Sequence, residues 1–201
     1  MSDIGAFIQL GFHHIVALDA ADHILFLLAL AAIYRGKDWR SVLWVITAFT
    51  VGHSVTLALA VTNVIVAPRA VIEFLIPVTI VLTGIENLIA RERVASGPGA
   101  RHRPVFAAAF GLVHGAGFAD YLRALFVDRL AAPLFGFNVG IELGQLVVLV
   151  CAFVAFWLVD RSLAALPLAA ARRAPFHARL IGVSAIVTIV AAAWAWQRWP
   201  A

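Results

Sequence analysis

Charged residues are scarce in this 201-residue chain, because Asp, Glu, Lys and Arg together make up only 13% of it. A soluble domain carries roughly a quarter charged residues on average, so the composition excludes a cytosolic enzyme and a disordered chain. The chain is instead 63% hydrophobic, with a mean hydropathy of +0.97. The sequence therefore predicts an all-α, polytopic protein of the membrane, with the lipid bilayer as its first partner.

Cysteine is nearly absent as well. The single one, Cys151, lies in an apolar run, which excludes a disulfide framework or a cysteine-rich zinc site within one chain. The pI of about 10.2 does not indicate nucleic acid as a partner. The 15 Lys and Arg residues form short clusters between apolar runs, where basic residues orient membrane helices.

Six apolar runs approach or exceed the roughly 20 residues that a bilayer-spanning helix needs. They lie at residues 4–34, 41–66, 71–90, 105–127, 133–159 and 178–199. The first run is too long for one straight span and contains several ionisable residues, so we expect it to be tilted or broken there. We treat residues 1–201 as one transmembrane domain, with a loop at 91–104 between the third and fourth spans.

Basic residues gather in alternate connections between the predicted spans. They are Arg35, Lys37 and Arg40 in the first, Arg91, Arg93, Arg101 and Arg103 in the third, and Arg161, Arg172, Arg173 and Arg179 in the fifth. Short loops rich in Lys and Arg stay in the cytoplasm. We therefore expect loops one, three and five to be cytoplasmic and both termini to lie outside.

Ionisable side chains also occur inside the predicted spans, although a charge at the centre of a membrane helix costs at least about 2.5 kcal/mol on insertion scales. They are His13, His14, Asp19, Asp22 and His23 in the first span, His53 in the second, Glu73 and Glu86 in the third, His114 in the fourth and Glu142 in the fifth. Apart from Arg123, no Lys or Arg inside the spans offers an ion-pair partner. This set indicates a site for a cation, either a metal ion or protons.

Helical spacing sharpens the prediction for the first span. At about 100° per residue, Asp19, Asp22 and His23 fall on one face of a helix. His14 falls on the far side of a regular helix from His23, so it joins this face only if the helix unwinds, or else it serves a second site. The alternative for each residue is a polar side chain that bonds to a neighbouring helix.

Two further histidines lie mid-span in patches of small residues. His53 follows Gly52, and His114 lies among the glycines of residues 111–117. Small residues allow helices to cross closely, so these patches indicate a tight crossing, a ligand role or both.

Oxygen donors complete the candidate set. Asn138, Glu142 and Gln145 share one face of the fifth span, while Glu86 and Asn87 lie nearer the cytoplasmic end of the third. The candidate metal ligands are His14, Asp19, Asp22, His23, His53, His114 and Glu142. The candidate polar or proton pathway consists of Glu86, Asn87, Asn138 and Gln145.

Several segments together resemble the HupE/UreJ family of bacterial membrane proteins. They include GFHHI at 11–15, DHILFLLAL at 22–30, HSVTL at 53–57, FGLVHGAGFA at 110–119 and FNVGIELGQL at 137–146. The resemblance covers the first five spans. It implies a multi-pass protein of the bacterial inner membrane that transports nickel or cobalt to supply hydrogenase or urease.

In that family a histidine and an Asp-His pair occupy the first span, and the resemblance maps them onto His14, Asp22 and His23. The element at 18–21 lengthens the gap between them by about two residues, which turns a helix by roughly 200°. His13, His14 and Asp19 are therefore alternatives for the first ligand.

Three functions remain open. The first is a carrier or permease for a divalent transition metal, nickel or cobalt before zinc or copper, driven by protons or the membrane potential because no Walker-type loop is present. In that case Glu86 or Glu142 would carry the proton. The second is an intramembrane zinc hydrolase, and the third is a non-catalytic, metal-binding accessory protein. The sequence leaves a homo-oligomer open.

Overall fold

The fold is a bundle of helices, seen in a computed structural model that describes residues 4–17, 20–90, 102–118, 131–165 and 174–200. These residues hold seven α-helices and no strand, which confirms the all-α prediction. The helices are α1 (Ile4–Val16), α2 (Ala21–Ala32), α3 (Trp39–Val61), α4 (Arg69–Ala90), α5 (His102–Gly117), α7 (Ala131–Ala165) and α9 (Pro175–Gln197). A short 3-10 helix, η2 (Gly36–Asp38), precedes α3.

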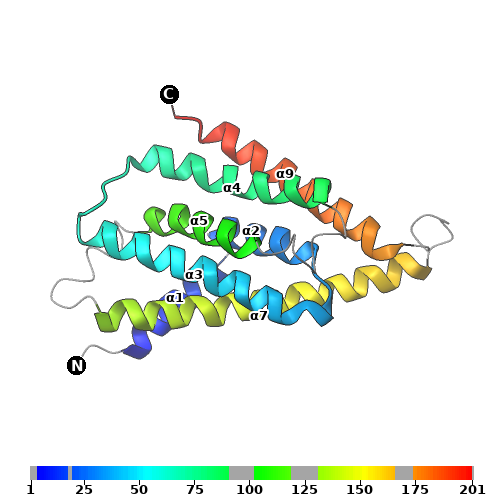
Figure 1. Cartoon of the computed structure of the whole chain (residues 1–201), viewed down its shortest axis with the longest axis horizontal. Coiled ribbons are helices and arrows are strands. Elements are labelled where there is room, and N and C mark those ends of the chain that lie inside the picture. Colours follow the sequence, from blue (N-terminus) through cyan, green and yellow to red (C-terminus); the bar gives the residue numbers. More distant parts are fainter. Residues whose placement is uncertain (1–3, 18–19, 91–101, 119–130, 166–173, 201) are drawn as a thin grey trace.

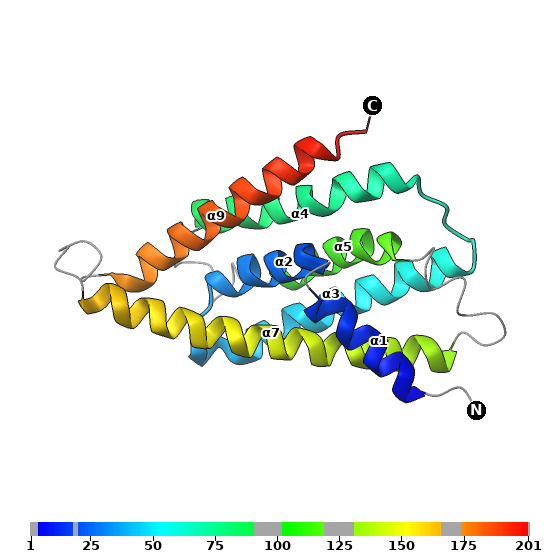
Figure 2. The same ribbon diagram turned by 180° about the vertical axis from the view of Figure 1, so that it is seen from behind.

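Figures 1 and 2 show most helices lying roughly along the long axis of the molecule, with α2 and α5 between the α4–α9 pair and the α3–α7 pair. We call the end where α1 begins and α9 ends the terminal end. The opposite end, where α2 and α4 end and α9 begins, is called the basic end. Its described basic residues are Arg35, Lys37, Arg40, Arg103, Arg161 and Arg179. This grouping is the one that the predicted orientation requires, and the assignment of sides stays a prediction.

Four helical segments are long and apolar enough to cross a bilayer, namely Gly36–Val61, Arg69–Ile89, Ala131–Ala165 and Pro175–Gln197. A fifth is the pair α1 and α2, taken as one broken span. Helix α5 has 16 residues, and the remainder of the predicted fourth span lies outside the described residues. Most of the predicted loop at 91–104 lies outside them too, and its last residues are helical because α5 begins at His102.

The predicted break in the first span is confirmed. The axes of α1 and α2 differ by 69°. Helix α2 then lies in the centre of the bundle, with Phe26, Leu27, Ala29 and Leu30 all buried. The bend therefore sends an interrupted span into the protein interior, where non-helical backbone can be shielded from lipid.

Glycine seams hold two helix pairs in close contact. A Cβ atom at Gly52 of α3 would overlap the carbonyl of Ala108, and one at Gly111 of α5 would overlap the carbonyl of Phe49. The pair α1 and α7 is built in the same way, because a Cβ at Gly11 would overlap the carbonyl of Phe137. Membrane helices associate through such close backbone approach, so the predicted tight crossing at residues 111–117 is confirmed.

Candidate metal centre

Four histidines from four helices converge in the middle of the bundle. His14 of α1, His23 of α2 and His53 of α3 each place a ring nitrogen within 4.8 Å of the other two. The ring of His114 of α5 lies beside them, with its centroid 5.2 Å from that of His23. We call these four residues the histidine cluster.

The bend between α1 and α2 is what brings the first two members together. His14 and His23 would point apart on a regular helix, yet their ring centroids are 4.6 Å apart. The bend therefore places His14 and His23 in one cluster, whereas on a straight helix they would lie on opposite faces.

The cluster is rich in buried nitrogen atoms without a hydrogen-bond partner. Within the described residues these are Nε2 of His14, Nε2 of His23, both ring nitrogens of His53 and Nδ1 of His114. Buried polar atoms in proteins are almost always satisfied, and an unsatisfied one costs about 1–3 kcal/mol. Three of the residues that carry these atoms, His14, His23 and His53, bring ring nitrogens within 4.8 Å of one another, so the cluster could hold a cation.

Asp22 orients His23 within the cluster. Its Oδ1 accepts a hydrogen bond from the backbone N–H of His23 at 2.9 Å and lies 3.1 Å from Nδ1 of the same residue. A carboxylate on one imidazole nitrogen directs the lone pair of the other nitrogen to a metal. This arrangement leaves Nε2 of His23 available as a ligand atom, with Asp22 holding the ring in place.

Thr79 of α4 orients His114 in a similar manner. Its hydroxyl donates to the carbonyl of Ile76 at 2.7 Å and lies 3.2 Å from Nε2 of His114. A threonine hydroxyl has a single hydrogen, so with that hydrogen on Ile76 the bond to His114 is donated by Nε2–H. The neutral imidazole then carries its lone pair on Nδ1, the buried atom that has no partner among the described residues.

Aromatic rings surround the histidine cluster. Phe118 and Phe137 stack on each other, and the ring centroid of Phe118 is 4.1 Å from that of His14. Towards the basic end, Phe26, Phe49 and Phe110 each lie three or four residues from a cluster histidine on the same helix. The Phe26 centroid is 4.9 Å from that of Phe49 and 6.3 Å from that of Phe110. These three rings form an apolar layer on the side of the cluster that faces the basic end.

On the other side the cluster is open to a cavity of about 680 Å³, which we call the vestibule. Its lining includes His14, His23 and His114, and Arg69, Glu73 and Arg198 at the terminal end. Arg69 pairs with Glu73 at 2.6 Å. The cluster is therefore accessible from the terminal end, with the apolar layer on its opposite side.

Glu86 and Asn87, predicted as part of a polar pathway, belong to a separate network at the basic end. Glu86 bonds to His102 at 2.7 Å and pairs with Arg103 at 3.4 Å. Arg103 also donates to Asn87 at 2.8 Å, and Asn87 donates to the carbonyl of Ala29 at 2.6 Å. We call this set the basic-end network.

The expectation that the acidic residues inside the spans lack partner cations apart from Arg123 is thus wrong for Glu86. Arg103 is helical rather than part of a loop, only 4% exposed, and paired with Glu86. The expectation is also wrong for Glu73, which pairs with Arg69. Arg123 lies outside the described residues.

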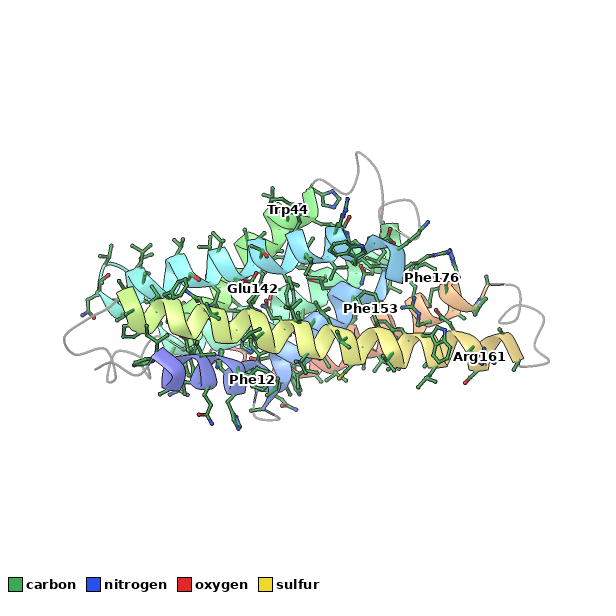
Figure 3. The ribbon with its side chains drawn as sticks, turned by 90° about the horizontal axis from the view of Figure 1, so that it is seen from below. Phe12, Trp44, Glu142, Phe153, Arg161 and Phe176 are labelled. Carbon is green, nitrogen blue, oxygen red and sulfur yellow. The ribbon has the colours of Figure 1, made fainter. Side chains whose placement is uncertain are left out.

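The structure also places the remaining predicted residues. Glu142 accepts a hydrogen bond from Thr47 at 2.7 Å, and Gln145 accepts one from Thr50 at 3.0 Å. Figure 3 shows Glu142 between α7 and α3, so these bonds tie two helices together outside the cluster. Asn138 has a buried Oδ1 without a partner in the described part of the chain, and Asp19 lies outside that part.

Thr79 and the apolar layer were not predicted. No sequence signal marks Thr79, because a threonine is common in membrane spans and its partner is 35 residues away. The phenylalanines did leave a signal. Each precedes or follows a cluster histidine by about one helical turn, which places both side chains on the same face.

Comparison with known proteins identifies the family of the chain. Residues 1–198 match the family described as HupE / UreJ protein. No curated protein and no solved structure matches the chain. Because the match covers nearly every residue, including all four cluster histidines, the chain belongs to the HupE/UreJ family.

Proposed function

We propose that this protein carries a divalent transition metal, nickel or cobalt, across the membrane and binds it at the histidine cluster. The observation that supports the proposal is the set of buried imidazole nitrogens of His14, His23, His53 and His114 without partners in the described residues, with ring nitrogens of the first three within 4.8 Å of one another. Neutral imidazole suits nickel, cobalt, zinc and copper. The family membership favours nickel or cobalt among these metals.

The vestibule supports a route for the metal. It joins the terminal end to the cluster, and the predicted orientation puts that end outside the cell. The metal would leave its hydration shell at His14 and His23 and be held above the apolar layer of Phe26, Phe49 and Phe110. Release to the other side requires that layer and the basic-end network to separate, which is an alternating-access cycle.

The membrane potential would favour this direction. Moving one elementary charge across 100 mV is worth about 2.3 kcal/mol, so a divalent cation gains about 4.6 kcal/mol on moving towards a negative interior. Glu86 is not required as a proton carrier for that movement.

The experiment compares His14→Ala with His13→Ala in proteoliposomes. The two residues are neighbours on α1 and both line the vestibule, but only His14 belongs to the cluster. We expect radioactive nickel or cobalt to accumulate in vesicles with the wild-type protein and with His13→Ala, and to fall at least about tenfold with His14→Ala.

Equilibrium binding of nickel and cobalt to the purified proteins separates binding from transport. Unchanged affinity and uptake in His14→Ala would refute the cluster as the binding site. Tight binding without uptake in the wild-type protein would refute the carrier and leave a metal-binding protein.

A further inference from the structure

Two adjoining cavities lie on the outer surface of α7 at the basic end, far from the histidine cluster. The first, of about 290 Å³, is polar in part, and its lining includes Tyr34, Arg35, Asp160, Phe176 and Arg179. The second, of about 350 Å³, is a largely apolar groove lined by Gly36, Trp39, Val150, Phe153, Val154 and Trp157. Both cavities have Gly36, Phe153 and Trp157 in their lining, so they are neighbours.

Two arginines share one aromatic ring in the polar cavity. The guanidinium carbon of Arg35 is 4.2 Å from the ring centroid of Phe176, and that of Arg179 is 4.8 Å from it. Arg179 is held by hydrogen bonds from Nε to Asp160 at 2.9 Å and from Nη1 to the carbonyl of Ala32 at 3.1 Å. These bonds use two of its five N–H donors, so the guanidinium retains donors for an anion.

The surroundings of this cavity carry a positive excess. The described segments at this end carry five basic residues, Arg35, Lys37, Arg40, Arg161 and Arg179, against two carboxylates, Asp38 and Asp160. Asp38 accepts a hydrogen bond from the backbone N–H of Arg35 at 3.0 Å. Positive charges held close together favour the binding of an anion. Arginine recognises a phosphate through paired N–H donors.

The apolar groove runs away from that charge along α7. Val150, Val154 and Trp157 are spaced at four and three residues and therefore share one helix face, where all three are more than half exposed. Figure 3 shows Phe153 along α7 and Phe176 at the start of α9, with Arg161 further towards the basic end of α7. The groove thus leads from a basic cavity towards the middle of the bilayer, and an amphiphile with an anionic head and an apolar chain has this shape.

We propose that the paired cavities bind one anionic phospholipid, with its phosphate against Arg35 and Arg179 and an acyl chain along Val150, Val154 and Trp157. Basic pockets between membrane helices on the cytoplasmic side are suited to such head groups. The site is independent of the metal site. It joins the connection after α2 to α7 and α9, so the bound lipid would brace the basic end of the bundle.

The experiment is native mass spectrometry of the full-length protein released from detergent after incubation with phosphatidylglycerol or phosphatidylcholine. We expect the wild-type protein to retain phosphatidylglycerol in preference to phosphatidylcholine. Arg35→Ala should weaken retention of phosphatidylglycerol about fivefold. The matched control is Arg40→Ala, because Arg40 lies nearby in the first turn of α3, over Trp39, but does not line the polar cavity.

A third variant tests the groove. Trp157→Ala removes an exposed wall shared by both cavities and should lower retention without removing a charge. Glycerol phosphate, which has the head group but no acyl chain, should not displace the bound lipid. Equal retention of the two lipids by the wild-type protein, or equal losses in Arg35→Ala and Arg40→Ala, would overturn the proposal. Displacement by glycerol phosphate would show an anion site without a lipid.

Discussion

The histidine cluster and the basic-end network, two groups of polar residues inside the bundle, differ in how many of their buried atoms have a hydrogen-bond partner. In the network, Asn87 bonds through both amide atoms, and Glu86 contacts both His102 and Arg103. Arg103 Nε is the one buried side-chain atom of these four residues without a partner in the described part of the chain. In the cluster, five buried ring nitrogens have no partner in the described part of the chain.

This difference distinguishes polar residues that stabilise the fold from polar residues that bind a ligand. A polar group that serves only the fold gains nothing from unsatisfied atoms, since each one costs free energy on burial. Among the described residues, only Asp22 and Thr79 bond to the cluster rings, and each bond leaves the other ring nitrogen, Nε2 of His23 or Nδ1 of His114, buried without a partner. With a hydrogen bond on one nitrogen, the other nitrogen of each ring keeps its lone pair, which favours the binding of a cation.

The largest effect is expected from His53→Phe, which replaces a fully buried histidine by an apolar ring of similar size. We expect nickel or cobalt affinity to fall by about 100-fold or more, because a ligand is lost from the first coordination sphere. The metal-free protein should be as stable as the wild type or more stable by about 1–2 kcal/mol, because two unsatisfied nitrogens disappear.

Calorimetric metal titration and thermal unfolding in detergent measure these two quantities on one preparation. His13→Phe is the control, since His13 is exposed and outside the cluster. A large loss of stability in metal-free His53→Phe would show that the histidine serves the fold, and the comparison between cluster and network would collapse.

The network should respond in the opposite sense. Arg103→Met removes the partner of Glu86 and Asn87, and we expect the free energy of unfolding to fall by about 2–3 kcal/mol, because buried polar groups are left unsatisfied. Metal affinity should change less than about twofold, since Arg103 lies eleven residues before His114, about 16 Å along α5.

The control for this variant is Arg69→Met. Its ion pair with Glu73 is exposed, so its loss should cost less than about 1 kcal/mol. Thermal unfolding of both variants measures the two losses. Equal destabilisation by Arg103→Met and Arg69→Met would contradict a structural role specific to the basic-end network.

The sequence predicts the bundle and much of the site for physical reasons that these residues illustrate. Apolar run length locates long helices well, since the span predicted at 71–90 is observed as α4 at Arg69–Ala90. The break in the first span follows from its ionisable residues, which a continuous membrane helix tolerates poorly. The HupE/UreJ assignment, made from short motifs, is confirmed over residues 1–198.

What the sequence leaves out depends on contacts between distant helices. The angle between α1 and α2 decides whether His14 meets His23, and no local pattern encodes it. Arg103 was predicted to be a loop residue because the positive-inside rule uses the positions of charges in the sequence and not their contacts. The partners of Glu142 and Thr79 lie 95 and 35 residues away, so their roles emerge only from the packing.

A smaller effect than those above is expected from Thr79→Val, which keeps the shape of the side chain and removes the acceptor for Nε2–H of His114. Without that acceptor the imidazole can carry its proton on either nitrogen, so part of the population loses the Nδ1 lone pair. We expect metal affinity to fall about tenfold, the lower bound for a residue that orients a ligand. Thr79→Ser keeps the hydroxyl and should keep the wild-type metal affinity. Equal affinities for Thr79→Val and the wild type would remove His114 from the ligand set.

The smallest effect is expected from Glu142→Gln, and it tests whether the cluster is complete without α7. Glu142 accepts a hydrogen bond from Thr47, and a glutamine can accept the same bond through its amide oxygen, so the contact between α3 and α7 is retained while the carboxylate is lost. If the metal is held by the four histidines, its affinity should change less than about twofold. A tenfold loss in the same titration would mean that Glu142 moves to the metal when it binds, and the division between a cluster of imidazoles and a frame of satisfied polar residues would have to be redrawn.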